Sequence, residues 1–212
     1  MHLCDLPGII RAMGNREDLL AGAKQCLQGK GYARTTVRDI ASAAGVSMAA
    51  IGYHFGSREE LLNAALLQAI DEWGMEIGRA VAGAVDPAAT PAEQYEATWA
   101  QIIRTFDTHR VLWVASVEAF VQAEHSPGLR RQIAAGQAEG RRGVTAGLLG
   151  TPEDAVPETA TRTLGAVQMA LLSGVMMQSL TDPDGAPSAA EILAGLRALV
   201  AVLERGQADQ DS

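Results

Sequence analysis

The chain has 212 residues, of which 48% are hydrophobic and 20% charged, and its formal net charge at pH 7 is −8. This length allows one large domain or two small ones, and the acidic balance argues against non-specific nucleic-acid binding by the whole chain. The charge is uneven, however. Residues 16–58 carry six basic against three acidic side chains, a net +3, which leaves −11 on the remainder. A basic module on an acidic body is typical of a protein that presents one face to phosphate.

The first residues fit neither a signal peptide nor a membrane span, because an acidic residue, a proline and a glycine interrupt them and no basic segment precedes them. We expect a flexible arm over residues 1–12, with Met13 as an alternative start. The two cysteines, Cys4 and Cys26, form neither a CxxC pair nor a metal-ligand spacing. We therefore expect a reduced, cytoplasmic compartment.

Residues 16–30 predict the first helix, because leucines and an alanine recur along one face. Thr35 and Thr36 follow it, and either hydroxyl can cap the next helix or donate a hydrogen bond to a phosphate.

The stretch 37–55 predicts two short helices joined by a tight turn. Apolar residues of the first helix fall at i, i+3, i+4 and i+7: Val37, Ile40, Ala41 and Ala44. Gly45 can adopt the left-handed conformation that ends a helix, and Ser47 can accept a backbone N–H as N-cap of the second. The outward residues of that second helix are Ser47, Met48, Ala49, Gly52, Tyr53 and His54. A short helix with small outward residues fits a DNA major groove, so the spacing predicts a helix-turn-helix over residues 36–55.

The remaining sequence predicts helices throughout, so the expected fold class is all-α. Residues 57–60 form a capping box that opens a fourth helix reaching about Ala84. Five further helices are expected at residues 92–108, 110–124, 127–149, 158–180 and 188–205. The segment 158–180 is hydrophobic on nearly every side, so more than one of its faces should be covered. The polar tail, residues 206–212, is expected to be disordered.

Sequence motifs for catalysis are absent. No HExxH, Walker loop, GxSxG or GxGxxG occurs, and the four histidines show no metal-ligand spacing. We therefore expect no enzymatic activity, no cofactor and no metal site.

Residues 16–70 resemble the TetR family of bacterial transcriptional regulators. The segments that carry the resemblance are 31–32, 35–41, 44–47, 53–55 and 57–61, in matching order and spacing. They cover about the first third of the chain, and the C-terminal part is similar in layout alone. The resemblance implies an N-terminal helix-turn-helix DNA-binding domain of three helices, residues 13–73. It also implies a C-terminal helical bundle, residues 74–205, that binds an effector and dimerises.

The resemblance also implies which side chains meet DNA. They are Thr35, Thr36, Arg38, Ser47, Met48, Ala49, Gly52, Tyr53, His54 and Arg58. Arg38 would read guanine or hold a phosphate, and Arg58 stands where the family often has a phosphate-facing lysine. Gly52 departs from the family, which often has a tyrosine there, and so removes one phosphate contact. Four of these residues have a simpler alternative: Tyr53 and His54 could pack, Arg38 could pair with a nearby acid, and Arg58 could be an ordinary first-turn residue.

Two further sets of candidate site residues belong to the expected C-terminal domain, one for an effector pocket and one for a dimer contact. The candidates for an apolar effector pocket are Trp99, Phe106, Trp113, Glu118, Phe120, Gln168, Met169 and Met176, any one of which could equally be a core or surface residue. The expected dimer contact joins the last two helices of each copy. Its residues are Gly165, Ala166, Ala170, Gly174, Leu196, Val200 and Leu203.

The function hypothesis is a homodimeric repressor that binds a palindromic, double-stranded operator and is released by a small apolar effector, without a membrane partner. One rival is an activator of the same architecture. Another is a helical ligand-binding protein or enzyme in which the helix-turn-helix is only a structural corner. The sequence names neither the effector nor the operator.

Overall fold

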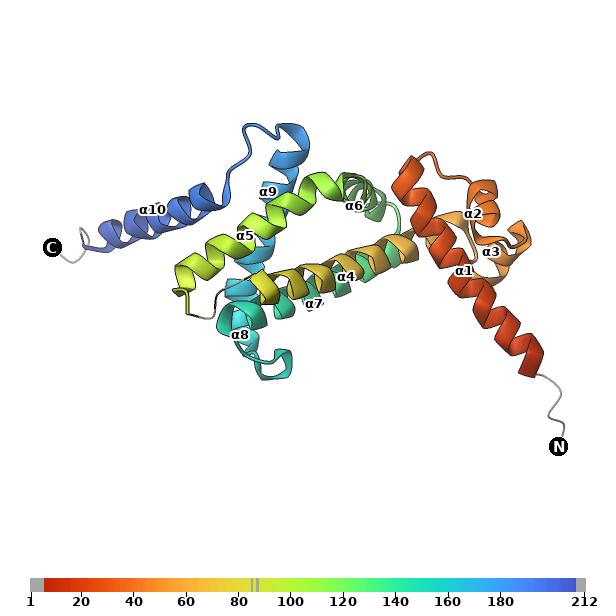
Figure 1. Ribbon diagram of the computed structural model, residues 1–212, viewed down its shortest axis with the longest axis horizontal. Coiled ribbons are helices and arrows are strands. Elements are labelled where there is room, and N and C mark those ends of the chain that lie inside the picture. Colours follow the sequence, from red (N-terminus) through yellow and green to blue (C-terminus); the bar gives the residue numbers. More distant parts are fainter. Residues whose placement is uncertain (1–5, 85, 87, 209–212) are drawn as a thin grey trace. The chain divides into compact units, whose positions relative to one another are not determined.

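The computed structural model describes the backbone of residues 6–84, 86 and 88–208, and every regular element among them is a helix (Figure 1). The all-α prediction is therefore confirmed for this part of the chain. The helices are α1 (Leu6–Lys30), α2 (Val37–Ala44), α3 (Met48–Phe55), α4 (Arg58–Ala84), α5 (Pro91–Thr108), α6 (Arg110–Ala123), α7 (Pro127–Leu149), η1 (Glu153–Ala155), α8 (Glu158–Ala160), η2 (Thr161–Gly165), α9 (Ala166–Thr181) and α10 (Ala189–Ala208).

Helix α1 starts ten residues earlier than the sequence predicted. It begins at Leu6 instead of Arg16, so residues 6–12 of the expected flexible arm are helical. Pro7 falls in the first turn, where a missing N–H costs no helical hydrogen bond. Residues 1–5 of the expected arm and 209–212 of the expected tail lie outside the described residues.

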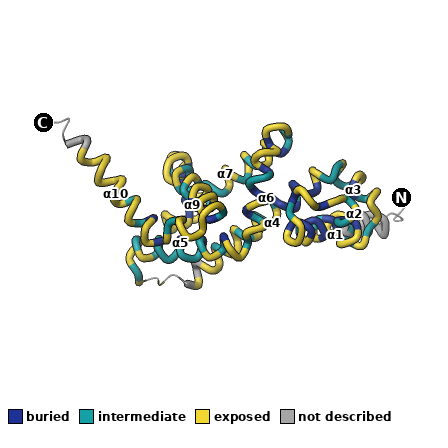
Figure 2. The backbone as a smooth tube through the Cα atoms, turned by 90° about the horizontal axis from the view of Figure 1, so that it is seen from above, coloured by how far each residue is buried: buried dark blue, intermediate teal, exposed yellow. Residues whose placement is uncertain are grey.

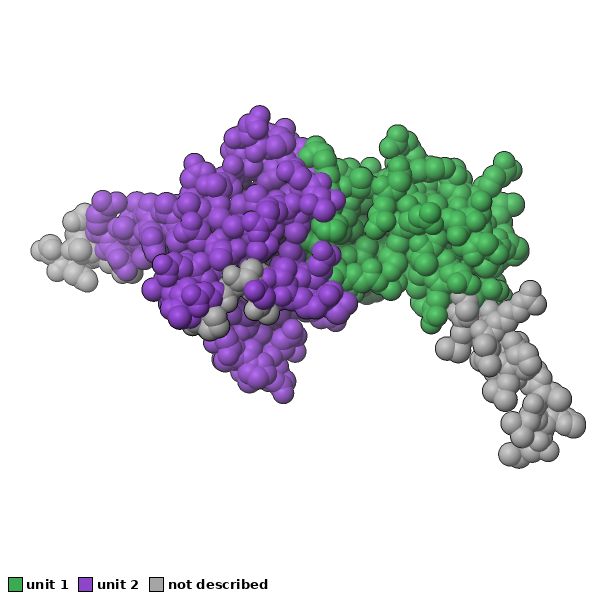
Figure 3. All heavy atoms as spheres, viewed as in Figure 1, with its two compact units in different colours: residues 1–74, 109–138 green, residues 75–108, 139–212 purple. Residues whose placement is uncertain are grey.

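The chain divides into two compact units (Figure 3). The N-terminal unit comprises residues 1–74 and 109–138, and the C-terminal unit comprises residues 75–108 and 139–212. Helix α6 and the first half of α7 thus belong with the helix-turn-helix, so this unit is larger than the expected domain of residues 13–73. Helices α4 and α7 each contribute residues to both units.

A continuous apolar core holds the N-terminal unit together (Figure 2). Leu19 of α1, Ile40 of α2 and Ile51 of α3 are each at most 2% exposed, and they meet Leu61 of α4 and Leu129 of α7. Burying a side chain of this size stabilises the fold by about 1.5–3 kcal/mol. The two helices of the motif are therefore anchored on three longer ones.

A glycine allows α1 and α2 to approach closely. A Cβ built on Gly22 would lie 2.9 Å from the backbone nitrogen of Ala44 and 3.1 Å from the carbonyl oxygen of Ile40. Both neighbours are backbone atoms, which cannot rotate out of the way as a side chain can. The sequence did not single out Gly22, because a glycine inside a helix ordinarily signals weakness and not contact.

The C-terminal unit is built around α5, which packs against α9 and α10. Trp99 and Phe106 of α5 are at most 2% exposed. The expected helix 158–180 forms as α8, η2 and α9, with a π-helical segment in the middle. There Gly165 is buried, and an added Cβ would lie 2.6 Å from the carbonyl oxygen of Arg141 on α7. Gly165 is thus a packing residue within one chain, and its assignment to the dimer contact is corrected.

Gly22→Ala should lower the free energy of unfolding by about 1–2 kcal/mol. Overpacking costs about 1–3 kcal/mol and outweighs the gain of about 1 kcal/mol or less that alanine brings to a helix. Urea denaturation followed by circular dichroism measures the change. Gly29→Ala is the matched control, because Gly29 lies on the same helix with nothing within 4 Å of an added Cβ. Equal effects of the two variants would contradict a close approach of α1 and α2.

Candidate nucleic-acid interface

The turn between α2 and α3 has the geometry that the sequence predicted. Gly45 lies in the left-handed region at φ 65°, and the backbone N–H of Val46 donates to the carbonyl of Ala41 over 3.1 Å. This is the bond that closes a Schellman cap, and it satisfies a carbonyl at the end of α2. The turn therefore sets the angle at which α3 leaves α2.

The start of α2 is held by a reciprocal cap that involves Thr36 and Asp39. The backbone N–H of Asp39 donates to the Thr36 hydroxyl (3.2 Å), and the backbone N–H of Thr36 donates to the Asp39 carboxylate (2.9 Å). Lys30 and Thr36 hold the pKa of Asp39 well below its usual range. Because this pKa is depressed in the folded state, the stabilisation is present above the unfolded pKa of a carboxyl group and is lost on acidification.

The hydroxyls of the two threonines before α2 form hydrogen bonds within the chain. Thr35 is 1% exposed, and its hydroxyl donates to the carbonyl of Gly31 over 2.7 Å. Its side chain cannot reach a nucleotide, so its assignment to the DNA contact is corrected. Thr36 is exposed, but its hydroxyl both accepts from and donates to Asp39. Of the two expected roles of these hydroxyls, capping is the one that the geometry shows.

Helix α3 presents a broad face to solvent. Tyr53 is 81% exposed and Met48 is 53% exposed, whereas Ile51 on the opposite side is 2% exposed. Ser47, Ala49 and Gly52 are exposed too, and His54 is half-buried. The side of α3 that the sequence predicted to face the core is therefore the side that is buried, and the predicted outward side is exposed.

The N-cap of α3 differs from the prediction. Ser47 occupies the cap position with extended backbone, but its hydroxyl accepts no capping hydrogen bond. The first turn is closed by the backbone instead, through the N–H of Ala50 and the carbonyl of Ser47 (3.1 Å). The hydroxyl of Ser47 is thus not used to cap its own helix.

Tyr53 and His54 support each other at the end of α3. Their rings meet edge to face, with centroids 4.8 Å apart and planes at 87°. The high exposure of Tyr53 excludes the alternative of a core aromatic. Next to them, Phe55 packs against the core. The guanidinium of Arg16 lies over its ring, 5.1 Å from the ring centroid, in a cation–π contact.

Arg38 lies exposed on α2, close to its N-terminus. It forms no hydrogen bond or ion pair with the described residues, since Asp39 is engaged by Lys30 and Thr36. The simpler alternative, pairing with a nearby acid, is therefore not what the structure shows. An exposed guanidinium with five donors suits either a guanine edge or a phosphate.

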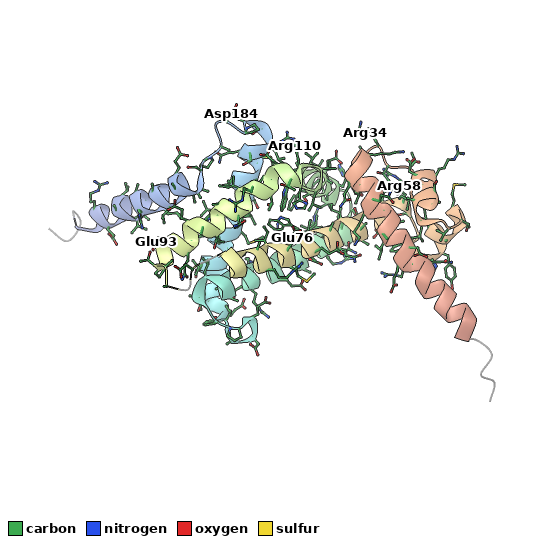
Figure 4. The ribbon with its side chains drawn as sticks, viewed as in Figure 1. Arg34, Arg58, Glu76, Glu93, Arg110 and Asp184 are labelled. Atoms are coloured by element: carbon green, nitrogen blue, oxygen red, sulfur yellow. The ribbon has the colours of Figure 1, made fainter. Side chains whose placement is uncertain are left out.

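Arg58 binds the chain's own backbone. Its Nε donates to the carbonyl of Thr35 and its Nη2 to that of Tyr32 (2.8 Å), while Nη1 pairs with Glu59 at 2.8 Å. The guanidinium also lies over the Tyr32 ring, and the side chain is only 21% exposed. Figure 4 labels Arg58 at its place on the helical ribbon. The donors expected to face a phosphate therefore hold the loop between α1 and α2.

A second polar contact joins the same loop to α4. The hydroxyl of Tyr32 donates to the side-chain carbonyl of Asn63 over 2.6 Å, and both residues are at most 5% exposed. Burial raises the pKa of the Tyr32 phenol, and the nearby Arg58 opposes this. We call Arg58, Tyr32 and Asn63 the loop clasp. The sequence carried no signal for the role of Asn63.

Comparison with known proteins identifies this architecture. A model of the tetR family of bacterial regulatory proteins matches residues 19–65, and a model of the tetracyclin repressor-like C-terminal domain matches residues 89–202. The chain belongs to the TetR family. It is therefore a DNA-binding transcriptional regulator with a helix-turn-helix, as the resemblance over residues 16–70 indicated.

Curated relatives match the chain over short segments. The chain is 39% identical over 51 residues to the transcriptional repressor AcnR of Corynebacterium efficiens, covering 24% of this chain and 27% of that protein. It is 38% identical over 69 residues to the transcriptional regulator TtgR of Pseudomonas putida, covering 32% of each. The chain thus matches about a third or less of the length of these relatives.

Solved structures match most of the chain. The multidrug binding protein EbrR complexed with imidazole superposes with a TM-score of 0.61 at 26% identity, covering 85% of this chain and 88% of EbrR. A transcriptional regulator from Rhodococcus sp. Rha1 gives 0.60 at 22% identity, covering 85% and 94%. The second likeness shows a shared fold only.

The residues expected to line an effector pocket are divided between the two units. Trp113, Glu118 and Phe120 lie in the N-terminal unit, and the other five lie in the C-terminal unit. Trp113 packs edge to face on Trp73, with ring centroids 4.5 Å apart. Phe120 lies on α6 and is 47% exposed, so it does not belong to the hydrophobic core of the N-terminal unit. The eight residues are therefore distributed over both units, and their grouping in one effector pocket stays a prediction.

Two of the expected polar anchors have different surroundings. Gln168 accepts a hydrogen bond from the hydroxyl of Tyr95 over 2.9 Å, while Glu118 forms no hydrogen bond with the described residues. Two buried indole nitrogens, those of Trp99 and Trp73, also have no partner in the described part of the chain. Nothing in the sequence singled out Trp73, because an indole in the middle of a long helix gives no signal beyond ordinary packing.

Arg58→Ala should lower the free energy of unfolding by about 1–3 kcal/mol, because it leaves two carbonyls without their charged donor. The slope of log affinity against log salt for DNA should stay unchanged. A lost phosphate contact would reduce that slope by about 1. Denaturation and DNA binding at several salt concentrations measure the two effects.

Arg58→Lys is the control for this prediction. It keeps the positive charge but lacks the planar fork that reaches two carbonyls at once. It should therefore restore little of the lost stability. A flatter salt slope for Arg58→Ala, returned to normal by Arg58→Lys, would show that Arg58 contacts phosphate after all.

Proposed function

We propose that this TetR-family protein is a repressor that binds a palindromic operator as a homodimer and leaves it when a small apolar effector binds. The observation that carries the DNA-binding part is the exposed outer face of α3 beside Arg38, a guanidinium without a partner among the described residues. The relative AcnR is named a transcriptional repressor, which supports this direction of control. The compartment that we propose is the cytoplasm, where the operator is located.

Recognition of the operator depends more on shape and methyl groups than on hydrogen bonds. The outer face of α3 offers Met48, Ala49 and Gly52, none of which has a polar side-chain group for base reading. Apolar side chains instead contact thymine methyl groups, and sequence-dependent DNA shape contributes the rest. Ser47, Tyr53 and His54 supply the polar groups at the two ends of this face, where we expect phosphate contacts.

Dimerisation is supported by apolar side chains left exposed on α9 and α10. Val167 and Met177 on α9 are 58% and 44% exposed, and Val200 and Leu203 on α10 are 54% and 63% exposed. The small residues Ala170 and Gly174 are exposed on α9 as well, which allows close approach of a second copy. Two copies of each helix would bury these faces in a four-helix contact, with Ala166 and Leu196 at its edge.

The apolar helix that ends in α9 also meets the length and composition of a membrane span. Within Glu158–Thr181, only 28% of the apolar stretch that is long enough to span a membrane is buried in the single chain. A dimer of a DNA-binding regulator explains the exposed apolar surface without a membrane. We therefore propose that the remaining apolar surface is covered by the second copy.

The effector site that we propose lies in the C-terminal unit, around Trp99, Phe106, Gln168, Met169 and Met176. The first two are buried and the unpartnered indole N–H of Trp99 can donate to an effector. EbrR, a structural neighbour, is described as a multidrug binding protein, which supports ligand binding in this fold. An effector there would shift α4, which contributes to both units, and so separate the two heads. By linkage, operator DNA must weaken effector binding by the same factor.

Arg38→Ala should lower operator affinity by about 1–3 kcal/mol and relax the preference for one base pair, if Arg38 forms a bidentate contact with guanine. Fluorescence anisotropy with operator fragments identified by footprinting upstream of its own gene measures both. Arg131→Ala, which removes an exposed arginine from α7, is the matched control and should leave affinity unchanged. An Arg38→Ala protein with normal affinity and base preference would refute this role.

Leu203→Glu should convert the dimer to a monomer and abolish tight operator binding, because two charges would be buried opposite each other across the four-helix contact. Light scattering and operator titrations measure the two effects. Ala198→Glu places the same side chain about 140° around α10 and should leave the dimer intact. A wild-type protein that is monomeric at micromolar concentration would exclude the dimer outright.

A further inference from the structure

Half of the basic side chains between residues 16 and 58 are already paired with acids. These pairs are Lys24–Glu72, Lys30–Asp39 and Arg58–Glu59. The described residues form no ion pair with the other three, Arg16, Arg34 and Arg38. Nε of Arg34 donates to a carbonyl beside its own loop, and Arg38 already has a proposed role. Arg16 is therefore the arginine whose position is still unexplained.

Arg16 is held at the end of the recognition helix by an aromatic ring. Helix α1, which carries Arg16, contacts α3 (Figure 1). The Arg16 guanidinium lies over the ring of Phe55, the last residue of α3, at 5.1 Å from the ring centroid. Arg16 is exposed and forms no hydrogen bond with the described residues. The ring thus fixes the guanidinium in place while its five N–H donors stay available to a ligand.

Phe55 places this guanidinium at the edge of the exposed outer face of α3. Met48, Gly52 and Phe55 follow one another at i, i+4 and i+7, and a helical side chain covers the turn before its own Cα. Met48 is 53% exposed, and a Cβ added to Gly52 would meet nothing within 4 Å. The Phe55 ring, with the guanidinium over it, therefore continues the open stripe that Met48 and Gly52 begin.

We infer that Arg16 is a phosphate-binding residue, a contact to the DNA backbone from outside the helix-turn-helix. Its guanidinium donates to a phosphate oxygen of the strand that borders the groove occupied by α3, and Phe55 is the positioning residue beneath it. Hydrogen bonds between a charged donor and a phosphate oxygen are about twice as strong as those between neutral groups. The inference rests on the proposed docking of DNA against the outer face of α3.

The acids next to Arg16 in the sequence do not neutralise it. Glu17 and Asp18 follow it directly, but successive residues of a helix point about 100° apart, and neither acid pairs with Arg16 in the structure. The residues one turn further along α1 are the apolar Leu19 and Leu20, and α3 contains no acidic residue. Arg16 therefore presents an uncompensated positive charge beside α3.

The simpler role of this contact is structural, a cation–π pair that only covers the Phe55 ring. Such a pair would stabilise the fold, but its removal would not change how DNA affinity depends on salt. A phosphate contact does change this dependence, because each neutralised phosphate releases condensed counterions. The salt dependence of binding therefore separates the two roles.

The experiment is a titration of a fluorescent duplex of mixed sequence with the full-length chain, followed by anisotropy at several salt concentrations. No operator is needed, because phosphate contacts are independent of sequence. Arg16→Gln removes the charge and Arg16→Lys keeps it. Arg16→Met also removes the charge, but its unbranched apolar chain can still cover the ring. Lys24→Gln is the matched control, since it removes the same charge from α1 where Lys24 is paired with Glu72.

The plot of log affinity against log salt should be flatter in Arg16→Gln and Arg16→Met, by about 0.9 for each bound helix-turn-helix. Their affinity at physiological salt should fall about three- to tenfold for the same reason. Arg16→Lys should keep the wild-type slope, because an ammonium group also neutralises a phosphate. Lys24→Gln should keep it too.

The inference is overturned if Arg16→Gln and Arg16→Met keep the wild-type slope. It is also overturned if Lys24→Gln flattens the slope as much, since net charge alone would then explain the effect. Circular dichroism shows whether each variant folds, and Arg16→Met still decides should Arg16→Gln not fold. A wild type that binds no duplex would overturn the proposed docking of DNA as well, whereas a binding wild type matched by its Arg16 variants would overturn this contact alone.

Discussion

The position of the recognition helix depends on how α4 holds the loop between α1 and α2. Arg58 reaches two carbonyls of that loop, and Asn63 accepts from the buried hydroxyl of Tyr32. Hydrogen bonds that involve a charged donor contribute about 1.5–3 kcal/mol, and leaving a buried partner unmet costs a similar amount. The loop therefore cannot move away from α4 without losing several such contacts, and α2 and α3 follow the loop.

This arrangement changes the role of the first turn of α4. An arginine there opposes the helix dipole unless an anion is near, and the sequence suggested DNA phosphate as that anion. In the structure, Glu59 and the carbonyls of Tyr32 and Thr35 provide the negative charge. The same side chain thus fixes the head on its long helix. The DNA-binding head is therefore joined to α4 by polar contacts in addition to apolar packing.

Much of the N-terminal unit could be predicted from the sequence, because its signals are local. The Gly45 turn, the Thr36–Asp39 cap and the inward side of α3 each depend on residues within four or five positions of one another. Gly22, Arg58 and Asn63 could not be predicted in the same way. Their roles arise from contacts between residues that are 18 to 31 positions apart, and no pattern along the chain records which carbonyl or helix they will meet.

The effector side was harder to predict for a related reason. Apolar periodicity identifies α5, α6 and α9 as packed helices, but it does not indicate which of their side chains share one compact unit. Trp113 illustrates this, since it packs on Trp73 within the N-terminal unit, whereas Trp99 belongs to the C-terminal unit. A buried polar group without a hydrogen-bond partner is more informative about a ligand site than apolar periodicity is. Among the described residues, a carboxylate oxygen of Glu118 and the indole N–H of Trp73 are unpartnered in the N-terminal unit, and the indole N–H of Trp99 is unpartnered in the C-terminal unit. Such groups arise from how other helices pack around them, so periodicity along the chain could not identify them.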